Sequence, residues 1–124
     1  MIGYNAGATS LGNGYTLSNC ICIGTDSFIG KSITSLNNSI AIGNSAVVYD
    51  NSCIAIGYSS ISSNLSCISL GDRAETSNDY AIAIWCKAIN SGANSIALGY
   101  SANSNNNNCI VIGYNSTATG TYCI

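Results

Sequence analysis

The block Ser39-Ile40-Ala41-Ile42-Gly43 decides the fold, because close copies of it return at a fixed interval through the rest of the chain. The copies are Cys53-Ile54-Ala55-Ile56-Gly57, Cys67-Ile68-Ser69-Leu70-Gly71, Ala81-Ile82-Ala83-Ile84-Trp85, Ser95-Ile96-Ala97-Leu98-Gly99 and Cys109-Ile110-Val111-Ile112-Gly113. Each copy begins 14 residues after the one before it. Such an internal repeat is typical of a solenoid, in which each repeat forms one coil and is stabilised by its neighbours.

Each block alternates aliphatic residues with small or polar ones, which is the pattern of a half-buried strand. A second, shorter alternation between the blocks, as in Ala46/Val48 and Ala74/Thr76, predicts a second strand in every coil. We expect the aliphatic side chains of the blocks to form the core. They are Ile40, Ile42, Ile54, Ile56, Ile68, Leu70, Ile82, Ile84, Ile96, Leu98, Ile110 and Ile112.

Two sets of residues at fixed places predict two tight corners in each coil. The first set ends the blocks: Gly43, Gly57, Gly71, Gly99 and Gly113. The second set follows seven residues later: Asp50, Asn64, Asn78, Gly92, Asn106 and Gly120. Gly, Asn and Asp are the residues that tolerate a left-handed backbone, so we expect that conformation at both corners.

These patterns predict an all-β protein, a parallel β-solenoid of 14-residue coils that forms a single domain over residues 1–124. The repeats are regular over 43–124 and irregular over 1–43. The interval from Gly24 to Gly43 is 19 residues, with five extra residues expected near Phe28 to Ser32, and the interval from Gly3 to Gly24 is 21. We expect both insertions to bulge out as loops.

Composition excludes several classes of function. Only eight residues carry a formal charge, and the three basic ones are Lys31, Arg73 and Lys87, so nucleic acid is not an expected partner. There is no apolar stretch of about 18 residues, so we expect no membrane insertion. Met1-Ile2-Gly3-Tyr4 lacks the features of a signal peptide.

Catalysis and metal binding are not expected either. The chain has no His, and its serines have no adjacent base of a suitable type. Cys20-Ile21-Cys22 resembles half of a metal site, but alternate strand residues face opposite sides and no second pair is near. We therefore expect no enzyme activity, no catalytic residue, no metal and no cofactor.

Two columns of side chains are candidates for a special role. Cys20, Cys53, Cys67, Cys109 and Cys123 share the slot of Ser39 and Ser95. In-register strands lie about 4.8 Å apart, too far for a relaxed disulfide, so we expect small buried thiols, with links between chains left open. Tyr58, Tyr100 and Tyr114 follow block-ending glycines and could bind a sugar or a partner protein, stabilise one another or fill a lateral interface.

From Gly43 to Ile124, the 14-residue unit with its Ser-Ile-Ala-Ile-Gly block resembles the head repeat of YadA-type trimeric autotransporter adhesins. It is also similar to repeats of phage and large-virus fibres. The adhesin resemblance implies a left-handed β-roll, three chains packed side by side, and adhesion to host or matrix surfaces. It implies an extracellular location or the surface of a particle.

The two ends of the chain share the phase of the repeat. Joining Cys123-Ile124 to Met1-Ile2-Gly3 would place Gly3 where the next block-ending glycine belongs. We therefore expect axial assembly through these ends, which makes the chain a structural filament subunit that pairs with itself, unless it is a piece of a longer repetitive protein. The alternatives are an adhesin head that binds a host receptor, glycan or matrix protein, and a segment of a viral or phage fibre.

Overall fold

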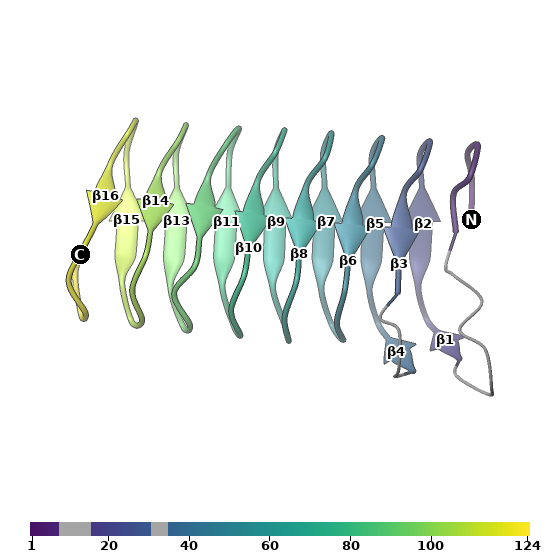
Figure 1. The fold of residues 1–124 in the computed structure, drawn as a ribbon, viewed down its shortest axis with the longest axis horizontal. Helices are drawn as coiled ribbons and strands as arrows, with labels where there is room; N and C mark the ends of the chain where they lie inside the picture. The colour runs from purple at the N-terminus through teal and green to yellow at the C-terminus, as the bar shows by residue number, and fades with distance from the viewer. Residues whose placement is uncertain (8–15, 31–34) are drawn as a thin grey trace.

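The computed structural model describes residues 1–7, 16–30 and 35–124. Within these ranges it contains strands and turns and no helix. From Ile40 onward, three-residue strands alternate along the chain with two-residue strands, one of each per 14-residue coil. The coils stack into a rod whose two chain ends lie at opposite ends (Figure 1). The predicted all-β parallel solenoid of 14-residue coils is confirmed.

Two parallel sheets run the length of the rod. We call the sheet of three-residue strands sheet A; it contains β2 (Ile21–Ile23), β5 (Ile40–Ile42), β7 (Ile54–Ile56), β9 (Ile68–Leu70), β11 (Ile82–Ile84), β13 (Ile96–Leu98) and β15 (Ile110–Ile112). Sheet B contains β3 (Phe28–Ile29), β6 (Val47–Val48), β8 (Ile61–Ser62), β10 (Glu75–Thr76), β12 (Ile89–Asn90), β14 (Asn103–Ser104) and β16 (Thr117–Ala118). Each strand pairs in register with the strand one coil away, so equivalent residues form columns along the rod.

The irregular coils differ from expectation in one respect. Phe28 pairs with Val47 and Ile29 with Val48, so both belong to a regular strand and not to the insertion expected near Phe28 to Ser32. The next pairing, Leu17 of β1 (Leu17–Ser18) with Leu36 of β4 (Leu36–Asn37), also joins corresponding places in two coils. The extra residues therefore fall between these pairings, where 8–15 and 31–34 lie outside the described residues.

The interior of the solenoid is lined mostly by small side chains and not by the Ile and Leu residues of the blocks, so the predicted set of core residues is wrong. In sheet A the buried residue is the middle one of each strand: Cys22, Ala41, Ala55, Ser69, Ala83, Ala97 and Val111. In sheet B it is the second residue: Ile29, Val48, Ser62, Thr76, Asn90, Ser104 and Ala118. The expected core residues, Ile40 and Ile42 and their equivalents through Ile112, face outward and are half-buried or exposed. A coil of only 14 residues brings its two sheets close together, and small side chains fit that narrow space.

Hydrogen bonds hold the polar part of this interior. Ser62 Oγ donates to the Ile54 carbonyl oxygen at 2.8 Å, and Ser69 Oγ donates to that of Ile61 at 2.7 Å. These bonds cross from one sheet to the other, and buried hydroxyls are tolerated because they find such partners.

The two corners differ in their backbone. At the first, Gly43 and Gly57 have φ of 133° and 135°, and a Cβ on Gly57 would lie 2.3 Å from the Gly71 carbonyl oxygen. Glycine is needed there for both reasons. At the second corner, the expected left-handed residues Asp50, Asn64, Asn78, Gly92, Asn106 and Gly120 do not have positive φ. That part of the prediction is wrong.

The left-handed residue of the second corner comes two places later. It is Ser52, Ser66, Tyr80, Asn94, Asn108 or Tyr122, with φ between 54° and 59°. This region is sterically open to residues with a Cβ at a modest cost, whereas the glycine corner lies well outside it. The second corner therefore accepts Ser, Asn and Tyr, and the sequence carries no constant glycine to mark it.

Candidate functional site

The outer face of sheet A is a continuous aliphatic surface. The first and third residue of every strand are Ile or Leu, and no strand of this sheet carries a charged residue. Ile21, Ile56 and Ile112 are exposed, Ile112 by 66%. The seven strands extend about 30 Å along the rod at the usual strand spacing. A contiguous exposed apolar surface of this kind marks an interaction site.

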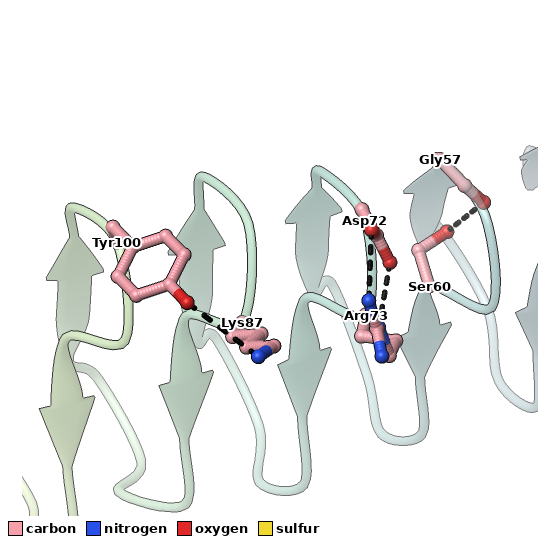
Figure 2. A network of polar contacts seen from close by, with 6 residues as sticks. All are labelled: Gly57, Ser60, Asp72, Arg73, Lys87 and Tyr100. Atoms are coloured by element: carbon pink, nitrogen blue, oxygen red, sulfur yellow. Dashed lines mark hydrogen bonds and ion pairs between the residues drawn. The ribbon is translucent and has the colours of Figure 1, made fainter.

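The corner that follows the glycine column carries a cluster of charges in the middle of the rod (Figure 2). Arg73 Nε and Nη2 donate to the two carboxylate oxygens of Asp72 at 2.8 and 3.1 Å. These bonds hold the pKa of Asp72 below its usual value and raise that of Arg73. One coil further, Lys87 Nζ lies 3.5 Å from the Tyr100 hydroxyl and 5.7 Å from the centre of its ring. Lys87 forms no ion pair with a carboxylate of the described residues.

The tyrosines of this corner lie in line in one column, but the column is interrupted. Tyr100 and Tyr114 lie on neighbouring coils with nearly parallel rings, 5.3 Å between centroids and 11° between planes. Tyr58 stands apart, because Asp72 and Cys86 occupy the equivalent places of the two coils between. Tyr58 and Tyr114 are exposed by 56% and 75%. The expected neighbours, Tyr100 and Tyr114, stabilise one another, and both exposed rings stay available to a partner.

Trp85 was not singled out from the sequence, although it is the one block-ending residue that is not glycine among the six copies. It occupies the glycine column with a φ of 108°, where a residue with a Cβ is strained. Its side chain is 61% exposed. The backbone is packed closely at this point, since a Cβ on Gly71 would lie 2.5 Å from the Trp85 carbonyl carbon. The replacement of the block-ending glycine by Trp85 was the sequence feature that could have indicated a special role for this residue.

The outer face of sheet B is hollowed across four coils, a feature that sequence reasoning missed. The hollow has a volume of about 620 Å³, and we call it the sheet B groove. Its lining residues are Ser59, Ile61, Arg73, Glu75, Lys87, Ile89, Ser101 and Asn103. They form two columns, at the second and the fourth residue after the block-ending position. The 14-residue spacing of Arg73 and Lys87 could have indicated that these two cations lie together.

The cysteine column is part of the hydrogen-bonded interior. Cys53, Cys67 and Cys109 are fully buried, and each Sγ donates to the carbonyl oxygen of the residue 11 places later, at 2.7 to 2.9 Å. Ser39 and Ser95 make the same bond. All seven cysteines are free thiols. A hydrogen bond to the neighbouring Cys67 sulfur, in which Cys53 keeps its proton, and burial raise the pKa of Cys53.

Other sites considered from the sequence can be placed briefly. Cys22 points into the interior and Cys20 is half-buried. No group of three His, Cys, Asp or Glu side chains suited to a metal occurs among the described residues. In the same ranges, no helix is long and apolar enough to cross a membrane.

The two ends of the rod are exposed. Ile2 pairs with Ile23 of the following coil, and the Ile110 amide donates to the Cys123 carbonyl oxygen at 2.8 Å. Both end segments are thus held by the neighbouring coil. Head-to-tail assembly through Met1, Ile2, Gly3, Cys123 and Ile124 stays a prediction, as does the viral fibre alternative.

Comparison with known protein families identifies the repeat. Residues 37–60, 91–115 and 110–122 match the YadA head domain repeat. These segments span both the first regular coils and the C-terminal ones. No curated protein matches the chain. The match agrees with the 14-residue coil, the glycine corner and the in-register stacking, and these segments of the solenoid are similar to the YadA head repeat.

Proposed function

We propose that this chain is the head module of a YadA-type adhesin, a stiff rod that packs against two further copies of itself and displays its other faces to a partner. The observation that carries the proposal is the outward aliphatic surface of sheet A. The matching repeat supports the adhesin class, and the resemblance to trimeric autotransporter adhesins supports three chains, a left-handed roll and a location at the cell surface.

The aliphatic surface is suited to a copy of the same chain. The interior contains mostly Ala, Ser and Cys, so much of the large apolar surface of the chain stays on the outside. Covering that surface yields the hydrophobic free energy that the narrow interior does not supply. A partner that fits along the full length must present apolar side chains at the same axial spacing. A second and a third copy of this chain meet that requirement coil by coil.

Oligomeric state tests this part of the proposal. The native protein should sediment as a trimer, and Ile82→Asp, which puts a charge in the middle of the aliphatic surface, should sediment as a monomer. Val47→Asp puts the same charge on the outer face of sheet B and should leave the trimer intact. Circular dichroism checks that both variants keep their strands. A native protein that sediments as a monomer at every concentration contradicts the trimer.

Adhesion is tested separately. The purified trimer should bind to surfaces coated with extracellular matrix proteins or to cultured cells, measured by surface plasmon resonance or by counting coated beads. The Ile82→Asp monomer should detach faster, because it loses the avidity of three linked binding surfaces. If the trimer binds no surface above the level of an unrelated β-rich protein, the adhesin role is wrong and a purely structural role replaces it.

A further inference from the structure

The sheet B groove has the shape of a site for a chain-like ligand. Its two columns each contribute four residues from four successive coils. Three intervals of about 4.8 Å give it a length of roughly 14 Å along the rod. This face lies opposite the aliphatic surface of sheet A within each coil, so packing through sheet A leaves the groove open.

The lining combines apolar and polar groups in the way that a sugar ring requires. Ile61 and Ile89 offer apolar contacts for the C–H face of a ring. Glu75, Ser59 and Ser101 offer acceptors and hydroxyls for its hydroxyl groups. At the far end, the side-chain oxygen of Asn103 is buried without a hydrogen-bond partner. Buried polar atoms normally have a partner, so this oxygen has an unmet capacity that a ligand hydroxyl can fill after a small rotation of the side chain.

The charges of the groove favour an anionic group on the ligand. Arg73 and Lys87 occupy equivalent places in the turns of adjacent coils, and like charges at such neighbouring places repel. Asp72 neutralises Arg73 and also attracts Lys87 from a longer distance, whereas the direct contacts of the Lys87 ammonium are those with the Tyr100 hydroxyl and ring. A carboxylate next to Lys87 would remove the repulsion and form a charge-assisted hydrogen bond.

The adjoining corner adds exposed aromatic rings. Trp85 lies two residues before Lys87 and holds a strained backbone in a column where the other blocks have glycine. Such strain persists where the side chain has a use that outweighs it. Indole and phenol rings give flat apolar contact with a polar edge, and Tyr58 and Trp85 are both more than half exposed.

A peptide is a poorer match to this face. Peptides that bind sheets commonly add a strand to an open edge. From β3 to β16 the strands of sheet B are paired in one continuous row, so the face within the rod offers side chains and no free backbone edge. A ligand recognised by side chains alone, with many hydroxyl groups of its own, suits the surface better.

We propose that the sheet B groove binds an oligosaccharide that carries carboxylate groups, with a carboxylate at Lys87, the sugar hydroxyls on Glu75, Asn103 and the serines, and Trp85 as an aromatic contact at the rim. The inference rests on the proposed adhesin function and names the ligand class of that function.

The test is a calorimetric titration of the purified protein with a hexasaccharide of galacturonic acid. Maltohexaose serves as the neutral control and hexaglutamate as the acidic peptide control. We expect the uronate to bind at least about tenfold more tightly than either control, since a charge-assisted hydrogen bond is worth about that factor. Added salt should weaken binding because the ion pair is exposed.

Variants locate the site. Lys87→Gln should weaken uronate binding about tenfold, while Lys87→Arg should keep most of it. Lys87→Ser combined with Ser45→Lys keeps the net charge and moves the cation along the same column, beyond the groove, to a residue with nearly the same φ (55° against 58°). That variant should lose binding as Lys87→Gln does. Trp85→Gly should weaken binding several-fold and also raise the denaturation midpoint, because it relieves the backbone strain. A variant that merely loses its fold would bind more weakly but would not have a higher denaturation midpoint.

The inference is overturned by equal affinity for the uronate and maltohexaose, by unchanged affinity in Lys87→Gln, or by absence of uronate binding at millimolar concentrations. Tighter binding of hexaglutamate also overturns it, in favour of a protein partner. These failures are separate from failure of the adhesin role. Adhesion of the trimer to matrix-coated surfaces without uronate binding retains the adhesin role and removes only the glycan.

Discussion

In the interior of this protein, cysteine thiols donate the same hydrogen bond that serine hydroxyls donate in other coils. Cys53, Cys67 and Cys109 hydrogen-bond the same corner carbonyls that Ser39 and Ser95 reach in their own coils. Exchange between Cys and Ser along the column therefore preserves the bond and changes little of the packing. The expectation of small buried thiols is confirmed for these three, whereas Cys20 and Cys123 of the same column are half-buried. The expectation missed this bond, because hydrogen-bond partners from the next corner are visible only once the coils are stacked.

The stability of the protein should fall at alkaline pH because of Cys53. Its pKa is raised in the folded state, so the folded protein holds this proton more tightly than the unfolded chain does. The stabilisation is complete below the unfolded thiol value of about 8.5 and is lost as pH rises above it, by up to about 1.4 kcal/mol per pH unit. Urea denaturation between neutral pH and pH ~10 measures this slope.

A serine variant gives the matched control. Cys53→Ser keeps the donor but does not titrate in this range, so its free energy of unfolding should fall less steeply with pH than that of the native protein. Parallel curves for the two proteins would show that Cys53 does not contribute to the alkaline loss.

Glycine at the first corner meets two constraints, a positive φ and a close approach to the next coil, and two of these glycines allow the constraints to be tested separately. Gly99 and Gly113 have nearly equal φ, 136° and 133°. A Cβ on Gly99 would lie 2.5 Å from the Gly113 carbonyl oxygen, whereas the nearest atom to one on Gly113 is Ser116 Oγ at 3.6 Å. Gly113→Ala therefore adds only backbone strain, and Gly99→Ala adds a collision with the next coil.

We expect Gly99→Ala to lower the free energy of unfolding by about 1–3 kcal/mol more than Gly113→Ala, the usual cost of overpacking a well-packed site. Equilibrium denaturation of the two variants and the native protein measures the difference. Equal losses would mean that the close approach of adjacent coils is relieved freely and that φ alone demands glycine.

The strands and their register were predictable from the sequence, but the face that each strand turns inward was not. The 14-residue period fixes which residues form columns, and it does so without any knowledge of burial. An alternating pattern, by contrast, does not show which of its two sets of side chains faces the interior. If the set is chosen wrongly, every residue of the strand is assigned to the opposite face. Ile40 and Ile42 were placed in the core because large apolar residues usually belong there. In a narrow coil, Ala41 and its equivalents take that place.

The candidate binding features were predictable only in part, for the same reason. Tyr100 and Tyr114 were expected to be neighbours because they share a column, and their rings are stacked. The sheet B groove depends on two columns with unequal side chains, such as Ile61 beside Ser59, and its depth comes from packing across four coils. Charge pairs within a coil, such as Asp72 with Arg73, depend on side-chain conformations that repeat spacing does not fix.

Because each strand pairs only with its neighbours one coil away, the rod behaves as a stack of equivalent units. A complete coil can therefore be removed without disturbing the others, provided that the phase is kept. Deleting residues 44–57 joins Gly43 to Tyr58, brings β5 next to β9, and leaves the groove residues in place. Deleting residues 44–56 removes one residue fewer and shifts the later coils out of phase at the junction.

We expect the 14-residue deletion to unfold in one cooperative transition, with a denaturant slope lower by about a ninth, in proportion to the 14 of 124 residues removed. The 13-residue deletion should be the less stable protein, because at the junction it turns interior residues outward or forces a bulge that breaks the pairing. Urea denaturation followed by circular dichroism compares the two. If both deletions were equally stable, the phase of the repeat would not matter and the alignment of residues in columns would not determine stability. If the 14-residue deletion were stable and the 13-residue deletion weakened, the complete coil would be the structural unit that contributes stability to this fold.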